Sequence, residues 1–122
     1  MAIVQLLIGH GAYIETQDSV GRRALQYAAS SGHEAISRLL LNRGANVNGR
    51  AHNRLTPLHH AASNGNVATV QLLLDFGANM EARDLEEQTA GMIAVSKNHE
   101  STILLLLSSG ANIESSRRSP SA

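Results

Sequence analysis

A Gly-Ala pair recurs at a fixed interval along this chain. The four pairs begin at Gly11, Gly44, Gly77 and Gly110, so that they are equally spaced with no insertion between them. A constant period of this length indicates one supersecondary unit stacked on copies of itself. The period therefore predicts a solenoid, an architecture that offers a long surface and seldom encloses a deep catalytic pocket.

The composition argues against several classes of partner and site. Ten Lys and Arg balance ten Asp and Glu, so the basic excess typical of nucleic-acid-binding proteins is missing. The chain has no cysteine, which excludes disulfides, thiolate metal ligands and cysteine nucleophiles and is compatible with a reducing compartment. No apolar stretch is long enough to span a bilayer, so we expect neither nucleic-acid binding nor membrane insertion.

The copy within residues 51–81 predicts a pair of helices. Thr56 is placed to cap a first helix that begins at Pro57, where a missing N–H costs nothing. Gly65 breaks this helix, and Gly77 ends a second one by adopting left-handed geometry. The predicted core positions of the two helices are apolar: Leu58, Ala61, Ala62, Val70, Leu72, Leu73 and Leu74.

These residues resemble the ankyrin repeat. The resemblance rests on the run Thr-Pro-Leu-His-His-Ala-Ala at residues 56–62, followed by Gly65, three leucines at 72–74 and Gly-Ala-Asn at 77–79. The same pattern lies one period earlier, and the interval between the Gly-Ala pairs equals the repeat length of that family. The resemblance covers about residues 3–114 and implies an all-α solenoid of stacked antiparallel helix pairs joined by β-hairpin-like loops.

We expect one ankyrin-repeat domain over residues 1–114. It comprises a partial first repeat (1–15), two full repeats (16–48 and 49–81) and a last repeat (82–114), followed by a disordered tail or linker stub at 115–122. The partial repeat lacks its partner helix, so we interpret the chain as a segment of a longer array. Weak self-association through that uncapped N-terminal helix is the alternative. The resemblance implies an intracellular protein, cytoplasmic or nuclear.

Departures from the repeat pattern predict local weaknesses. Arg54 occupies the position of a turn glycine, and Arg23 replaces the capping threonine of its repeat. Gly91 stands where Leu25 and Leu58 fill the core. Glycine costs about 1 kcal/mol of helix propensity, and the lost leucine costs about 2–5 kcal/mol if the gap stays unfilled. We therefore expect the last repeat to fray first.

The histidines predict structural roles. His33 and His99 share one position in the repeat, directly after the break between helices, where we expect them to bond nearby backbone. For His59 the resemblance implies hydrogen bonds that tie adjacent repeats together. His60 is its neighbour, so the two imidazoles point to different sides of a helix and do not chelate one ion. Asp84 is expected to accept backbone N–H groups at a hairpin turn.

The sequence shows no constellation for catalysis. No carboxylates converge in a pair, and the glycines do not form a phosphate loop. We expect no enzymatic activity, no cofactor and no metal. An enzyme remains only in the form of a catalytic domain elsewhere in a longer multidomain protein, in which these repeats regulate or self-associate.

The resemblance implies protein binding through the hairpin tips and the exposed side of each first helix, which together line a concave groove. Tyr27, His60 and Ile93 share one position on that side, and Tyr27 and Leu55 are the expected anchors. The predicted partner-binding residues are Arg22, Tyr27, Arg50, His52, Asn53, Leu55, His60, Arg83, Leu85, Glu86 and Gln88.

Charge divides the hairpin tips into two halves. Arginines crowd the first two tips (Arg22, Arg23, Arg50 and Arg54), and carboxylates dominate the third (Asp84, Glu86 and Glu87). One hypothesis is a partner whose acidic segment meets the arginines, since complementary charge steers association and sets register. The alternative is ordinary solvated loop charge.

Asn48 raises a question of modification. It lies in a hairpin run similar to those that asparaginyl hydroxylases modify in some ankyrin repeats. The alternative is an asparagine that only stabilises the turn.

Overall fold

The computed structural model describes residue 17 and residues 21–110. This part of the chain contains six helices and no strand. The helices follow one another in three pairs: α2 (Ala24–Ser30) with α3 (Glu34–Asn42), α4 (Pro57–Asn64) with α5 (Val67–Asp75), and α6 (Ala90–Ser96) with α7 (Glu100–Ser108).

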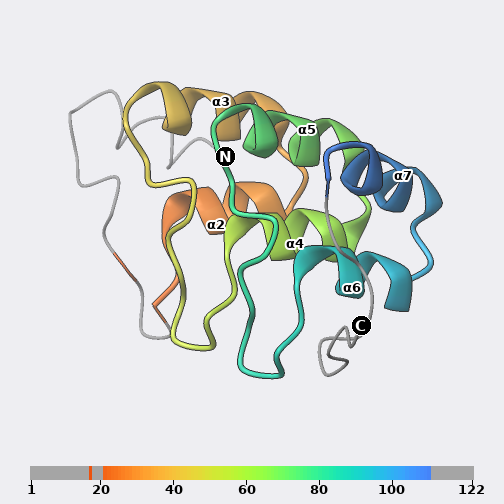
Figure 1. Ribbon diagram of the computed structural model, residues 1–122. Coiled ribbons are helices and arrows are strands. Elements are labelled where there is room, and N and C mark those ends of the chain that lie inside the picture. Colours follow the sequence, from red (N-terminus) through yellow and green to blue (C-terminus); the bar gives the residue numbers. More distant parts are fainter. Residues whose placement is uncertain (1–16, 18–20, 111–122) are drawn as a thin grey trace.

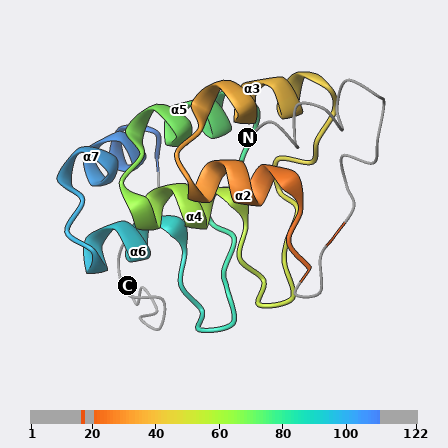
Figure 2. The ribbon, with the colours of Figure 1, turned by 180° about the vertical axis from the view of Figure 1, so that it is seen from behind.

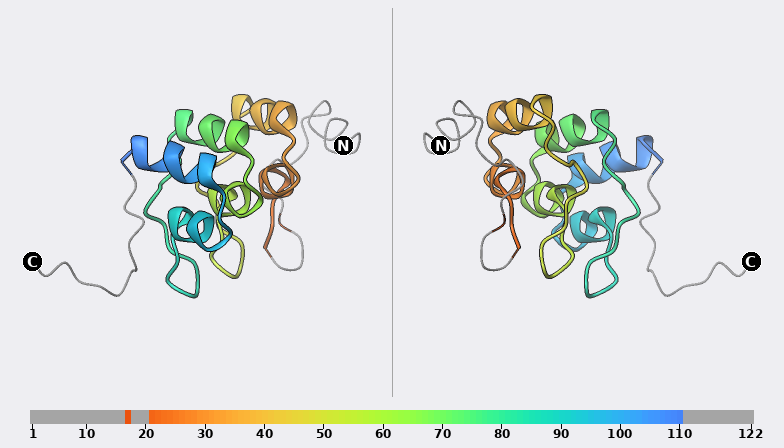
Figure 3. Two further views of the ribbon diagram at one scale, coloured as in Figure 1. Left: turned by 90° about the vertical axis from the view of Figure 1, so that its right-hand side faces the viewer. Right: turned by 90° about the vertical axis from the view of Figure 1, so that its left-hand side faces the viewer.

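The helices form two layers. The first helices of the pairs, α2, α4 and α6, lie side by side in one layer, and α3, α5 and α7 form the second (Figure 1). Seen along the stack, each pair follows the last in a regular succession (Figure 3). The long loops between pairs project beyond the layer of first helices, as the opposite view also shows (Figure 2). The predicted all-α solenoid is therefore confirmed.

The core is built from buried leucines and buried alanines. Leu40, Leu58, Leu73 and Leu106 are almost fully buried. Alanines at 28–29, 61–62 and 94 are completely buried where neighbouring first helices meet. Their small side chains let α2, α4 and α6 approach one another closely. The leucines then fill the space between the two layers.

Left-handed turns set the path of the hairpin loops. Gly21, Arg54 and Glu87 occupy equivalent positions one period apart, with φ angles of 82°, 67° and 64°. Only glycine adopts this conformation freely, so Arg54 and Glu87 hold it against a conformational cost of about 1–3 kcal/mol each. The turn geometry is thus a property of the repeat, and it persists where the glycine is absent.

The start of the first helix in each pair follows the sequence prediction only in part. The Thr56 hydroxyl accepts a hydrogen bond from the His59 N–H, as expected of an N-cap, and Pro57 follows it. The side chain of Arg23 makes no such cap at α2. Gln26 takes over instead, because its Oε1 accepts the backbone N–H of Arg23 at 2.9 Å.

Several predictions concern residues outside the described ranges. These are the partial repeat at 1–15 with its uncapped N-terminal helix, and the tail at 115–122. Within the described ranges, every helix is too short to cross a membrane.

Candidate protein-binding surface

Adjacent repeats are joined by side chains that bond the next hairpin. His59 is buried, and its Nδ1 accepts the backbone N–H of Thr56 at 3.0 Å. The proton therefore resides on Nε2, which donates to the carbonyl oxygen of Gln88 at 2.9 Å. Burial lowers the pKa of His59, which keeps the ring neutral. The expected link between repeats is confirmed at this position.

Gln26 makes the equivalent link one repeat earlier, a role that the sequence reasoning missed. Its Nε2 donates to the carbonyl oxygen of Leu55 at 2.7 Å, while its Oε1 holds the N–H of Arg23. Gln26 and His59 are one period apart, and so are Leu55 and Gln88. The shared register position was the available signal, since an amide offers the same donor and acceptor as a neutral imidazole.

His99 bonds backbone, as predicted, and the partner lies in the preceding repeat. Its Nε2 donates to the carbonyl oxygen of Ser63 at 2.9 Å. The turn at Gly65 explains this reach, because the imidazole packs directly against that glycine. His99 is therefore a link between repeats as well.

The expected division of charge is weaker than the sequence suggests. Arg23 directs its Nη1 to the carbonyl oxygen of Arg50 at 3.1 Å, so this guanidinium fastens the second hairpin (residues 49–56). Asp84 is 7 % exposed, and its Oδ1 accepts the N–H groups of Glu86 and Gln88 at 2.8 Å and 2.9 Å. This confirms its predicted turn role and removes it from the surface.

The third hairpin (residues 82–89) uses its arginine in the same structural way. Arg83 donates from Nη1 to the carbonyl oxygen of Glu87 at 3.0 Å. The carboxylates of Glu86 and Glu87 are exposed and make no ion pair within the described part of the chain. The acidic character of this tip thus rests on two glutamates.

The row formed by Tyr27, His60 and Ile93 is only partly a surface. Tyr27 is 37 % exposed, and the guanidinium of Arg22 lies over its ring at 4.7 Å from the centroid. Ile93 is 8 % exposed, which contradicts its expected place in a groove. An apolar side chain gains free energy by leaving water, and Ile93 has turned into the molecule.

His60, the middle residue of this row, is half-buried. Its Nε2 is buried and has no hydrogen-bond partner among the described residues. Burial is the main cause that lowers the pKa of His60 to about 4, with smaller contributions from His59 and Arg22. The ring is therefore neutral at physiological pH and is surrounded by groups that disfavour its protonation.

Two further predicted residues have structural contacts. The imidazole of His52 packs against Gly21, where an added β-carbon would lie 2.4 Å from Cδ2. Gln88 contributes its carbonyl oxygen to His59 and its N–H to Asp84. Both residues therefore have structural contacts in the hairpins. That they also bind a partner stays a prediction.

Four predicted residues meet in one hollow between the second and third hairpins. The hollow has a volume of about 230 Å³ and is lined by Asn53, Leu55, Asp84, Leu85 and Glu86. Leu85 is 63 % exposed and forms an apolar part of this wall. Its N–H donates to the carbonyl oxygen of Asn53 at 3.3 Å, which joins the two tips. We name this site the tip hollow.

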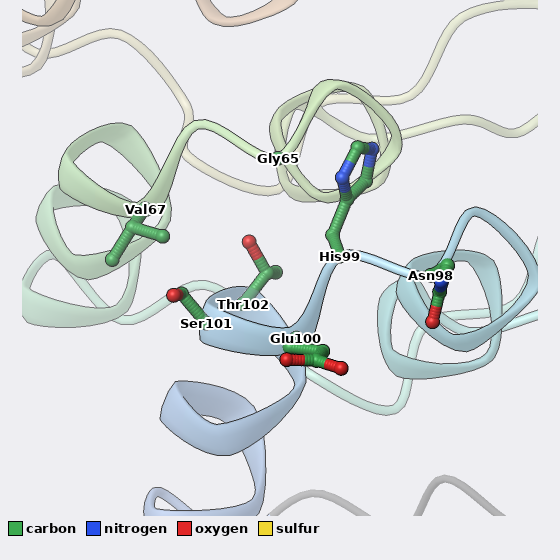
Figure 4. A pocket seen from close by; sticks show the side chains of 7 residues that line it. All are labelled: Gly65, Val67, Asn98, His99, Glu100, Ser101 and Thr102. Atoms are coloured by element: carbon green, nitrogen blue, oxygen red, sulfur yellow. The ribbon is translucent and has the colours of Figure 1, made fainter.

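A larger hollow of about 390 Å³ lies on the helix-turn side of the molecule (Figure 4). Its walls are Gly65, Val67 and residues 98–102. The imidazole of His99 is already bonded, and Glu100 points away from the Gly65–Val67 turn. The described residues include no group of three His, Asp or Glu that could hold a metal ion. This hollow offers no catalytic arrangement.

The comparison with protein families agrees with the architecture. A family model described as ankyrin repeats in three copies matches residues 1–51 and again 49–117. A search of curated proteins gave no match to this chain. Ankyrin repeats are generally protein–protein interaction modules and generally non-catalytic. With three stacked helix pairs, hairpin links between them and a match over nearly its whole length, the chain belongs to the ankyrin-repeat family.

Proposed function

We propose that this chain is a non-catalytic module that binds a partner protein through a concave face. The face comprises the hairpin tips and the exposed sides of α2, α4 and α6, and we expect it to act inside the cell. The observation that supports the proposal is the tip hollow, where an exposed leucine, an amide and a free carboxylate converge on a rigid pair of hairpins.

Rigidity favours this surface over the rest of the molecule. Gln26 and His59 bond the second and third hairpins, and Arg23 and Asp84 hold their turns. A preorganised surface loses little conformational entropy when a partner docks. The exposed leucine and tyrosine on the face are the kind of anchor that carries most binding energy in protein interfaces.

A matched pair of leucines tests the face. Affinity capture from cells that express the protein, followed by mass spectrometry, supplies a partner, and calorimetry with purified components gives the affinity. We expect Leu85→Ala to weaken binding by at least about tenfold, as truncation of a central anchor does. Leu104→Ala is the control, because Leu104 is 66 % exposed but lies on α7, away from the hairpins. The proposal fails if Leu104→Ala weakens binding and Leu85→Ala leaves it unchanged.

Charge reversal at the second tip tests the hypothesis of an acidic partner segment. Arg54 is exposed and Arg50 half-buried, and no side-chain bond of either is present in the described part of the chain. Arg50→Glu with Arg54→Glu is expected to slow association and to reduce its salt dependence. Unchanged binding to the purified partner would reject the acidic segment and leave the rest of the face untouched.

A second candidate function is self-association, favoured by the end of the stack formed by α6 and α7. Leu104, Leu107 and Val95 are exposed there, at 66 %, 45 % and 45 %. A second copy that covers these side chains would remove apolar area from water. Light scattering over a range of concentrations tests this candidate, and a strict monomer at high concentration removes it.

A further inference from the structure

The tip hollow is small and has an apolar wall. Its volume of about 230 Å³ is below the roughly 300–1,000 Å³ of sites that enclose small molecules. It is also several times the about 30 Å³ that one water molecule occupies in the liquid. Leu55 and Leu85 supply apolar wall on the two hairpins. The hollow is therefore large enough for one branched apolar side chain.

The rim of the hollow carries carboxylates on the third hairpin, whereas Arg54 lies between the lining residues Asn53 and Leu55 on the second. Glu86 lines it, and Glu87 follows on the same tip. Both carboxylates are exposed and unpaired within the described ranges, because Arg83, the one basic residue of this hairpin, is committed to the carbonyl oxygen of Glu87. Asp84 adds a buried carboxylate in the wall. The third-hairpin side of the rim therefore attracts cations.

The tip is held in this shape before any partner arrives. Asp84 accepts two N–H groups of its own turn, His59 bonds the carbonyl oxygen of Gln88, and Leu85 bonds Asn53 across the hollow. Glu87 has a left-handed backbone conformation, which sets the direction of the turn that leads from Glu86 to Gln88. The apolar wall and the negative rim are consequently presented in one fixed arrangement.

We propose that the tip hollow binds an aliphatic side chain of a partner segment whose neighbouring residue is Lys or Arg. This inference rests on the proposed function and names the chemistry of the partner at one point of the face. The aliphatic side chain enters between Leu55 and Leu85, and the cation pairs with Glu86 or Glu87. Shape selects the first group and charge the second.

Three short capped peptides provide the probe. All are embedded in Gly-Ser flanks, and their central residues are Lys-Leu-Lys, Lys-Ala-Lys and Glu-Leu-Glu. Titration into the ¹⁵N-labelled chain at low salt reports the site through amide shifts and the affinity through their saturation. We expect Lys-Leu-Lys to shift the amides of Asn53, Leu85 and Glu86, with affinity at least about fivefold above Lys-Ala-Lys and about tenfold above Glu-Leu-Glu.

Matched variants assign the two parts of the recognition. Glu86→Gln with Glu87→Gln should weaken Lys-Leu-Lys about fivefold and remove its advantage over Glu-Leu-Glu. Glu100→Gln is the control, because this exposed carboxylate lies at the start of α7. Leu85→Ala should remove the advantage over Lys-Ala-Lys, and Phe76→Ala, at an exposed apolar residue that ends α5, should leave it intact. The substituted side chains are exposed, so the variants are expected to fold.

The inference and the function fail in different ways. Equal binding of the acidic and basic peptides, shifts that map away from the tip hollow, or no shift at millimolar peptide would each overturn the inference. A natural partner that loses affinity on Leu85→Ala but not on the paired Glu→Gln change would also overturn it, while the proposed function would stand. A partner insensitive to both sets of tip variants would overturn both.

Discussion

The second and third helix pairs have the same register but different cores. Thr56 caps α4 and Thr89 caps α6, each by accepting an N–H three residues on. The next residues then diverge, from Pro-Leu-His at 57–59 to Ala-Gly-Met at 90–92. Leu58 is buried between the layers, whereas Gly91 at the equivalent position contributes no side chain. One pair thus has a leucine side chain at this core position, and the other has none.

Their surroundings differ as well. α5 packs between α3 and α7, whereas in the described part of the chain α7 packs mainly on α5 and α6. Val95 is 45 % exposed where Ala62 is fully buried. The two pairs show that one backbone pattern accommodates different cores, and we expect the third pair to be held less firmly than the second. The difference lies in a few side chains and in how many neighbours cover them.

The largest expected effect comes from truncating equivalent leucines. Leu73 and Leu106 occupy the same position in successive repeats, and both are fully buried. Leu73→Ala should lower the free energy of unfolding by about 3–5 kcal/mol and reduce amide protection in all three pairs, because it lies between two neighbours. Leu106→Ala should reduce protection in α6 and α7 with little change in α2 and α3. Denaturation and native-state hydrogen exchange measure both, and an equal loss in α2 would contradict the comparison.

Hydrogen exchange of the unmodified chain gives the next largest effect. The glycine at 91 and the missing leucine side chain predict that α6 opens at a free energy at least about 2 kcal/mol below that of α4. Met92, which could fill the space, remains partly exposed. The slowest amides of each helix supply the measurement. Equal protection of α4 and α6 would show that the gap is closed by repacking.

The pH dependence of stability should come mainly from the second pair. The pKa of His60 is lowered to about 4, below the about 6.5 of an unfolded chain. The unfolded state therefore binds the proton first, so stability is full above about pH 6.5 and falls as the pH drops towards 4. The loss is about 2 kcal/mol between about pH 7.5 and about pH 5.

Two substitutions isolate this contribution. His60→Gln should remove most of the pH dependence, and the lowered pKa of His59 accounts for what remains. His33→Gln is the control, because His33 is an exposed imidazole that lies before α3, outside the second pair. Ile93 holds the position of His60 in the third pair and binds no proton. At low pH, amide protection in α6 should therefore fall only because α6 packs on the destabilised α4. Denaturation curves at the two pH values decide, and an unchanged slope in His60→Gln would reject the assignment.

The sequence was sufficient for the backbone because the repeat imposes it. The period, the cap at Thr56 and the break at Gly65 predict the helix pairs, and the turn position predicts the conformation of Arg54. Gln26 shows the limit of matching by residue type. Only its position, one period before His59, points to its role, since glutamine is not the family's expected residue there.

The binding surface was less predictable because neighbours decide which side chains stay free. Arg23 and Arg83 read as surface charge, yet each bonds a carbonyl oxygen of a hairpin. Asp84 accepts N–H groups of its own turn, and Ile93 is buried. Whether such a side chain is exposed depends on the distances between neighbouring segments, and the repeat pattern does not give these distances. The tip hollow likewise exists only where two hairpins meet.

The smallest expected effect separates a simple cap from a cap that is part of a network. Thr89 bonds the N–H of Met92, and Thr89→Ala should cost about 1 kcal/mol, the usual value of an N-cap. Thr56 bonds the N–H of His59 and also lies 2.8 Å from its Nδ1, so Thr56→Ala should cost about 2 kcal/mol and loosen the bond to Gln88. Serine at each position keeps the hydroxyl and should restore most of the loss. Local exchange at residues 59, 88 and 92 distinguishes the two caps, because only Thr56→Ala should expose an amide in the neighbouring repeat. If both changes act only within their own helix, the ring of His59 is held without the threonine, and the link between repeats rests on Gln88 alone.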